Sequence, residues 1–208
     1  MKPLSLLITG ASMCLMFACG GGSSSSNGSD TTKAGDSTMS AMGDSSSMHK
    51  DSSAAPASPQ YSAGPVDKDD STFAVNAANG GMTEVTASQT AQSSASDQRV
   101  KDFAGMMVQD HTKAGDELKQ IAAAKSLTLP NAISDKNQKK ITDLGKKTGA
   151  DFDKAYVKMM LDDHKDAVDL FKKEADKGKD ADLKTFATKT LPTLEMHLDS
   201  IKAIAGKK

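Results

Sequence analysis

Four long stretches of this chain repeat apolar residues at steps of three and four, and this spacing constrains the fold more than any other feature. The stretches span about residues 71–93, 97–125, 150–177 and 180–204. Steps of three and four return to the same face of an α-helix, whereas a half-buried strand alternates at every second residue. A shorter helix is expected from Ser134 to about Lys147. The sequence therefore predicts an all-α domain.

The connections between these helices are short, which favours antiparallel neighbours. We therefore expect an up-down-up-down four-helix bundle, with one longer connection that holds the extra short helix between helices two and three. The first long helix should be the weakest, because Gly80 and Gly81 cost helix propensity. Gly178 should end the third long helix, and Pro192 should kink the fourth.

The segment from Gly20 to Pro65 cannot contribute to a hydrophobic core. Its 46 residues include 14 serines, 7 glycines, 3 prolines and one aromatic residue, Tyr61. Chains of this composition behave as flexible coil. We therefore predict a signal peptide at residues 1–18, a disordered Gly/Ser-rich tether at 19–66 and a four-helix bundle domain at 67–208.

The 23 basic and 23 acidic side chains of the bundle domain cancel, so the basic surface that binds nucleic acid is missing.

The N-terminal segment has the features of an export signal. Lys2 gives a short basic start, residues 4–17 are mostly apolar, and Ala18 is a small residue directly before Cys19. An apolar run of about 14 residues is shorter than the roughly 20 that span a bilayer. The arrangement resembles a bacterial lipoprotein signal, which implies membrane attachment through lipid on Cys19, in the cell envelope at the outer membrane facing the periplasm, or export. An ordinary secretory signal or an uncleaved anchor is the alternative.

Soft metal ligands occur in the predicted tether, but thiolates are missing from the predicted bundle. Met39, Met42, Met48 and His49 lie in a serine-rich background, and thioethers and imidazole are ligands for Cu(I). Compositional drift in a disordered segment is the alternative. Because both cysteines of the chain lie in the first 19 residues, the bundle domain has no disulfide, thiolate ligand or cysteine nucleophile.

Each of the three histidines in the bundle domain falls on the apolar stripe of a different predicted helix. His111, His164 and His197 lie on the second, third and fourth long helices, and Glu84 lies beside the stripe of the first. If the helices bring these positions to one level, the four side chains converge in the interior. Bundles build metal and cofactor sites in that position.

A repeated motif strengthens this metal hypothesis. Met106 to His111 is matched conservatively by Met159 to His164, and in each copy a methionine, Met107 or Met160, precedes the histidine by four residues on the same helical face. Three imidazoles, two thioethers and one carboxylate suit copper or zinc better than paired iron. The alternative is that the histidines are hydrogen-bonded core residues and the methionines fill the core.

Several blocks of the sequence carry a family resemblance. They are Gly81 to Val85, Phe103 to Lys113, Leu127 to Pro130, Gly149 to Tyr156, Met159 to His164, and Thr190 to Leu194 with His197. In this order they resemble the bacterial domain-of-unknown-function family 4142 (DUF4142). The resemblance implies outer-membrane or exported proteins with a ferritin-like helical bundle and no settled activity.

The catalytic signatures of ferritin-like enzymes are missing from the sequence. Their di-iron sites use a Glu-x-x-His pair on each of two helices, and no such pair occurs here. Phosphate-binding loops and nucleophile elbows are also missing from the sequence. We therefore do not expect an enzyme.

Two classes of function follow from these features. The first is a lipid-anchored, non-catalytic envelope protein that acts as a structural, stress-associated or interaction module, with envelope proteins or cell-wall polymers as partners. The second is a periplasmic protein that binds or buffers copper or zinc.

The lysine-rich run from Lys136 to Lys147 is typical of a solvated helix face, with contact to anionic headgroups or cell-wall polymers as the alternative.

Overall fold

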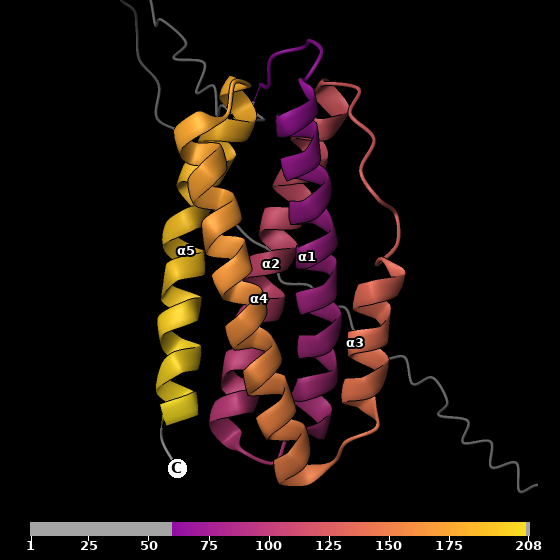
Figure 1. Cartoon of the computed structure of the whole chain (residues 1–208), viewed down its shortest axis with the longest axis vertical. Coiled ribbons are helices and arrows are strands. Elements are labelled where there is room, and N and C mark those ends of the chain that lie inside the picture. Colours follow the sequence, from indigo (N-terminus) through magenta and orange to yellow (C-terminus); the bar gives the residue numbers. More distant parts are fainter. Residues whose placement is uncertain (1–59, 207–208) are drawn as a thin grey trace, which may run out of the picture. The chain divides into compact units, whose positions relative to one another are not determined.

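The computed structural model describes residues 60–206, and within them five helices and no strand. The helices are α1 (Lys68–Ser94), α2 (Gln98–Ala124), α3 (Asp135–Gly145), α4 (Gly149–Lys177) and α5 (Ala181–Gly206). The four long helices pack side by side, and α3 lies along the outside of α1 (Figure 1). The predicted all-α bundle with one extra short helix is thereby confirmed. The predicted signal peptide, Cys19, and the tether residues Met39, Met42, Met48 and His49 lie outside the described residues.

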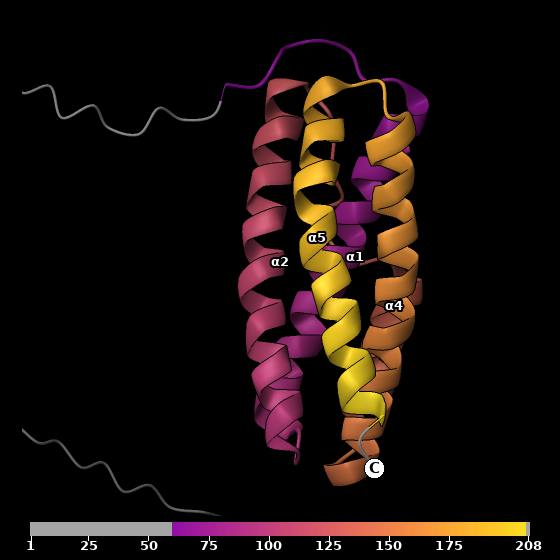
Figure 2. The same ribbon diagram turned by 90° about the vertical axis from the view of Figure 1, so that its left-hand side faces the viewer.

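Every pair of long helices that packs together is antiparallel, but the helix directions do not alternate along the chain. Lys125, directly after α2, pairs with Asp180 and Asp182 at the start of α5, and the backbone N–H of Lys179, directly after α4, donates to Asp70 at the start of α1. Helices α2 and α4 therefore end where α1 and α5 begin (Figures 1 and 2). The expected up-down-up-down order is therefore wrong. The observed order is up for α1, down for α2, down for α4 and up for α5.

The connection from α2 to α4 explains this order. The segment 125–134 and helix α3 carry the chain back along the whole bundle, so that α4 starts at the same end as α2. A single long crossover of this kind is found in ferritin-like bundles.

Local sequence signals set the ends of the helices. The carboxylate of Asp67 accepts hydrogen bonds from the backbone N–H groups of Asp69 and Asp70, which caps α1. Gly178 ends α4, as predicted. Ser134 occupies the N-cap position of α3, but its hydroxyl donates to Asn79 Oδ1 of α1 and makes no cap hydrogen bond. α1 continues through its two adjacent glycines, and α5 continues through Pro192.

Two hydrophobic clusters fill the bundle and are separated by a polar layer. The Tyr156 cluster contains Ala87, Ala91, Ala95, Val100, Phe103, Ala104, Met107, Leu144, Phe152, Tyr156, Met160 and Ile201. The Phe171 cluster contains Phe73, Ala74, Leu118, Ile121, Val168, Phe171, Leu183, Phe186, Ala187 and Leu194. Along each long helix, a buried polar residue lies where one cluster gives way to the other: Glu84, next to the buried Thr83, on α1, His111 on α2, His164 on α4 and His197 on α5.

Residues 60–66 lie against the bundle, at the end where α5 begins. The backbone N–H and hydroxyl of Ser62 donate to Asp182, and Tyr61 and Val66 pack against the Phe171 cluster. The Lys125 ammonium, with its side chain only 2% exposed, donates to the carbonyl of Ser62. The predicted domain boundary at residue 67 stays a prediction, and these contacts extend the packed region ahead of it.

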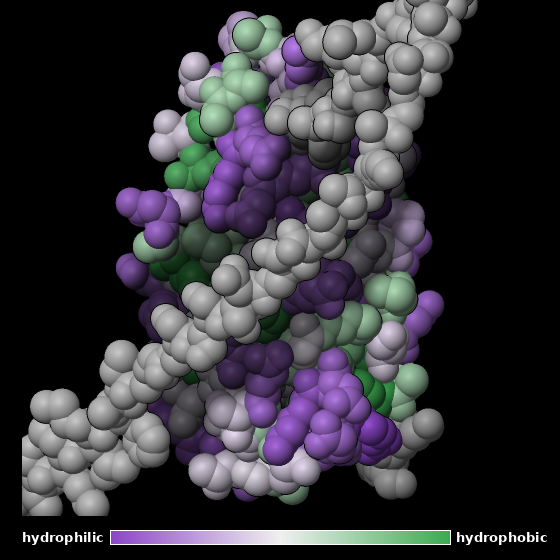
Figure 3. All heavy atoms as spheres, turned by 180° about the vertical axis from the view of Figure 1, so that it is seen from behind, coloured by the Kyte–Doolittle hydropathy of each residue, from purple (hydrophilic) through white to green (hydrophobic). Residues whose placement is uncertain are grey.

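The surface of the bundle is mixed in polarity. Among residues 60–206, Val75 and Met196 are the exposed large hydrophobic side chains. On the face seen in Figure 3, hydrophilic and hydrophobic residues are interspersed. None of the described helices combines the length and the apolar character needed to cross a bilayer.

Candidate metal centre

The polar layer brings together one side chain from each long helix. Glu84 comes from α1, His111 from α2, His164 from α4 and His197 from α5. His164 and His197 are fully buried, and Glu84 and His111 are 4% and 8% exposed. The convergence expected from the helical periodicity is therefore present.

The three imidazole rings form a nearly equilateral triangle. Their centroids lie 5.3–5.5 Å apart, and one ring nitrogen from each lies within 4.8 Å of the other two. At metal–nitrogen distances of about 2.0–2.1 Å, the nitrogens around one tetrahedral ion lie about 3.4 Å apart. Nitrogens that are up to 4.8 Å apart therefore have to approach one another by up to about 1.4 Å to share an ion.

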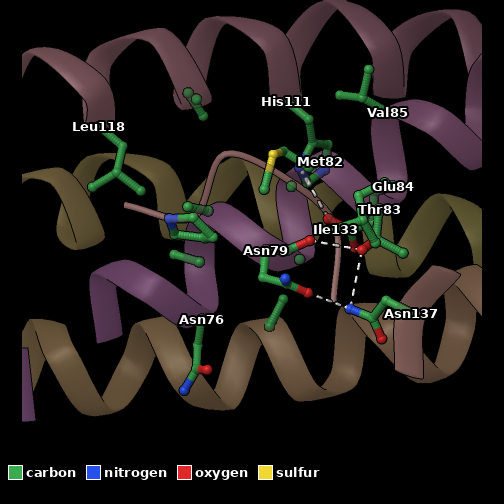
Figure 4. Close-up of a pocket in the computed structure, with 18 of the residues that line it drawn as sticks. Asn76, Asn79, Met82, Thr83, Glu84, Val85, His111, Leu118, Ile133 and Asn137 are labelled. Atoms are coloured by element: carbon green, nitrogen blue, oxygen red, sulfur yellow. Dashed lines mark hydrogen bonds and ion pairs between the residues drawn. The ribbon is translucent and has the colours of Figure 1, made fainter. Parts of the chain in front are cut away.

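Each ring is held through one nitrogen by a neighbouring oxygen. His197 Nε2 lies 2.9 Å from Asp110 Oδ2, and His164 Nδ1 donates to the backbone carbonyl of Met160 at 3.0 Å. His111 Nδ1 lies 3.1 Å from Glu84 Oε2 (Figure 4). These contacts fix the ring orientations and place a proton on the held nitrogen of His164 and, toward a carboxylate, on that of His197.

The second nitrogen of each ring has no protein partner. His111 Nε2, His164 Nε2 and His197 Nδ1 are buried and make no hydrogen bond with any residue in the described part of the chain. When the held nitrogen carries the proton, the second nitrogen carries a lone pair. Three lone pairs in an apolar interior are acceptors that only a cation, a proton or a donor molecule can satisfy.

Burial keeps the three imidazoles neutral. Desolvation lowers the pKa of His111 to about 3 and that of His164 to about 4, and it also lowers the pKa of His197. Desolvation raises the pKa of Glu84 to about 7. At neutral pH each ring is therefore a neutral imidazole with one N–H and one lone pair, the form in which histidine binds metals.

The carboxylate of Glu84 lies beside the rings and contacts their held sides. Its Oε2 faces His111 Nδ1, and its Oε1 lies 3.3 Å from His164 Nδ1. The glutamate expected among the ligands therefore sits where an outer carboxylate orients ligand histidines.

The two methionines of the repeated motif lie one helical turn from the rings. Met107 and Met160 are fully buried in the Tyr156 cluster. Met160 also contributes its backbone carbonyl to His164. Coordination of a metal by their sulfur atoms stays a prediction.

The aspartates of the repeated motif have different partners, and one of them belongs to the site. Asp110 on α2 reaches His197 on α5, whereas Asp163 on α4 accepts a hydrogen bond from Lys140 on α3 at 2.6 Å. Asp110 is not among the ligands expected from the sequence. In the sequence, the only feature that pointed to Asp110 was its place directly before His111, and Asp163 has the same place before His164. Helix periodicity alone does not tell which of the two aspartates contacts a histidine.

Comparison with known proteins places the chain in a family and supports its fold. The family model for "Domain of unknown function (DUF4142)" matches residues 55–204. No curated protein matches the chain. Among solved structures, the crystal structure of a DUF305 fragment from Deinococcus radiodurans is similar, with a TM-score of 0.62 and 10% sequence identity over 69% of this chain and 99% of that one. At this identity the similarity concerns the fold alone.

Proposed function

The chain belongs to the DUF4142 family, whose description names no activity, and we propose that it binds one transition-metal ion, copper or zinc, through His111, His164 and His197. One observation carries the proposal: each of the three buried rings has a nitrogen without a partner, and the opposite nitrogen of each is held by an oxygen.

The held nitrogens distinguish a metal site from three ordinary core histidines. A core histidine gains most when both of its ring nitrogens are hydrogen-bonded, because an unsatisfied buried polar group costs roughly 1–3 kcal/mol. Three such groups on adjacent rings would cost several times that amount. One cation satisfies all three, and the outer contacts to Asp110, Glu84 and the Met160 carbonyl are the kind that orient metal-binding imidazoles.

The donor set favours zinc or copper. Three neutral imidazoles with a fourth position left open is a common arrangement for Zn²⁺, and imidazole also binds copper well. Thioether ligands from Met107 or Met160 would favour Cu(I), because soft sulfur prefers the monovalent ion.

The location of the protein is part of this proposal. Lipid on Cys19 and the serine-rich tether behind it would hold the bundle close to a membrane of the cell envelope, where it buffers the metal. We expect the wild-type protein to fractionate with membranes and a Cys19→Ser variant to leave them. A wild-type protein found only in the soluble fraction would contradict the lipid anchor without affecting the metal site.

Metal titration tests the binding proposal. The purified full-length protein, stripped with a chelator, should retain about one equivalent of Zn(II) or copper after gel filtration, as measured by elemental analysis. His164→Gln and His197→Gln should abolish retention of zinc, because each removes one of three ligands. His49→Gln, in the predicted tether, is the matched control and should retain the zinc.

Circular dichroism of each variant checks that it remains helical. Retention of zinc by folded His164→Gln and His197→Gln proteins would overturn the proposal, and so would a wild-type protein that binds none of these ions. The second result would leave the non-catalytic structural or interaction module as the function.

A further inference from the structure

A pocket leads from the surface of the bundle to the polar layer. Its volume is about 820 Å³, and it is lined by residues of all five helices and of the segment 129–134. Glu84 and His111 are part of its wall, as the close-up in Figure 4 shows. Pockets that bind small molecules have volumes of roughly 300–1,000 Å³. The size and the end point of this pocket therefore suit a small molecule that reaches the imidazoles.

Two adjacent glycines of α1, Gly80 and Gly81, line this pocket and keep space open in it. A Cβ atom built on either glycine would meet nothing within 4 Å, and neither residue has the positive φ that would require glycine. A glycine inside a helix costs about 1 kcal/mol relative to alanine. Neither backbone strain nor close packing explains these two glycines, whereas an open pocket does.

The walls of the pocket combine apolar side chains with charged ones, four of which form two ion pairs. Met82, Leu118 and Ile133 are among the apolar residues labelled in Figure 4. Lys119 pairs with Asp116 at 2.9 Å, and Lys140 pairs with Asp163 at 2.6 Å.

Two of the amide side chains on the wall of the pocket are also hydrogen-bonded. The side-chain NH₂ of Asn137 donates to Asn79 Oδ1 at 2.7 Å and to Thr83 Oγ1 at 3.0 Å. Between these paired groups, the apolar side chains of the wall are suited to the hydrocarbon part of a ligand.

The open position of the metal centre indicates which group such a ligand carries. The carboxyl groups of Asp110 and Glu84 lie on the held sides of the rings and leave the fourth position of an ion on three imidazoles open. A carboxylate oxygen is a common ligand of Zn²⁺ in such a position.

We propose that this pocket binds a small organic monocarboxylate, whose carboxylate takes the fourth position on the metal and whose apolar body lies beside Gly80 and Gly81. This inference rests on the proposed metal site. It adds an exchangeable ligand class and a route by which that ligand reaches the ion.

Cobalt spectroscopy tests the proposal on the full-length protein. Co(II) in a tetrahedral site absorbs visible light, and its spectrum responds to a change of the fourth ligand. Benzoate serves as the carboxylate probe and azide as a small anion that needs little space. Gly81→Leu places a side chain in the pocket. The control is Gly145→Leu at the end of α3, where a Cβ atom also meets nothing within 4 Å and which does not line the pocket.

We expect benzoate to change the Co(II) spectrum of the wild type and of Gly145→Leu in a saturable way. Gly81→Leu should bind benzoate at least about tenfold more weakly, a loss of about 1.4 kcal/mol, and azide with unchanged affinity. An unresponsive Co(II) spectrum, or equal benzoate affinity in Gly81→Leu, would overturn the pocket inference and leave the metal site standing. A protein that binds no Co(II), Zn(II) or copper would overturn both.

Discussion

Replacing Glu84 with glutamine should change how the stability of the metal-free protein depends on pH. Glu84 is 4% exposed, and burial raises its pKa from 4.5 to about 7. The folded protein therefore binds the carboxyl proton more tightly than the unfolded chain does. Between pH 4.5 and 7, the contribution of Glu84 to the free energy of unfolding of the wild type therefore falls as the pH rises. In Glu84→Gln this contribution does not change, because glutamine does not titrate.

The size of the effect follows from the pKa difference. Each pKa unit corresponds to about 1.4 kcal/mol, so the change from 4.5 to about 7 amounts to roughly 3 kcal/mol. The free energy of unfolding of Glu84→Gln, minus that of the wild type, should rise by this amount between pH 4.5 and 7. The lowered pKa values of His111 and His164 act in the opposite direction, but they are present in both proteins and largely cancel in the difference.

Urea unfolding followed by circular dichroism, with a chelator present and at several pH values between 4.5 and 7.5, measures this difference. Glu195→Gln is the control for the loss of a carboxylate on the surface, because Glu195 lies on α5 with its side chain 45% exposed.

Two results would refute this reasoning. A difference that does not vary with pH would mean that Glu84 does not titrate near pH 7. A difference that falls as the pH rises would mean that Glu84 is a carboxylate paired with a protonated histidine, and the neutral imidazoles on which the metal site depends would be lost.

Three further substitutions test other parts of the structure by urea unfolding at neutral pH. Lys125→Met should lower the free energy of unfolding by about 3 kcal/mol, because it leaves two aspartates at 2.7 and 2.8 Å without their buried partner; an unchanged value would contradict the ion-pair role. Tyr156→Phe should cost about 1 kcal/mol through loss of the 2.8 Å hydrogen bond with Ser88, and a stabilised variant would contradict that bond. Gly80→Ala should raise the free energy of unfolding by up to about 1 kcal/mol, since it improves helix propensity in open space, and a destabilised variant would show that this space is not free.

The helices were predictable because their apolar spacing is regular over many turns. The C-terminal end of α4 followed from the glycine at position 178, and the periodicity placed all three bundle histidines on inner faces. The order of helix directions was not predictable in the same way. Short connections indicate antiparallel neighbours, but the length of the segment 125–148 allows the chain either to turn back or to cross the whole bundle.

The sequence predicted which histidines meet in the candidate site, but not how their rings are oriented. Periodicity brings His111, His164 and His197 to one level, but it does not tell which ring nitrogen faces inward. That choice depends on the side-chain rotamers and on partners from other helices, such as Asp110 for His197. The two glycines of α1 were interpreted only as a weakness of the helix, because the pocket they line is formed by residues far apart in the sequence.

The coordination of the bound metal tests the central claim most directly. X-ray absorption spectroscopy of the zinc-loaded protein reports the number, type and distance of the ligands. We predict about three imidazole nitrogens near 2.0 Å, with a fourth ligand of oxygen or another light atom. A first shell made only of oxygen, without the outer scattering of imidazole rings, would contradict a metal site at His111, His164 and His197.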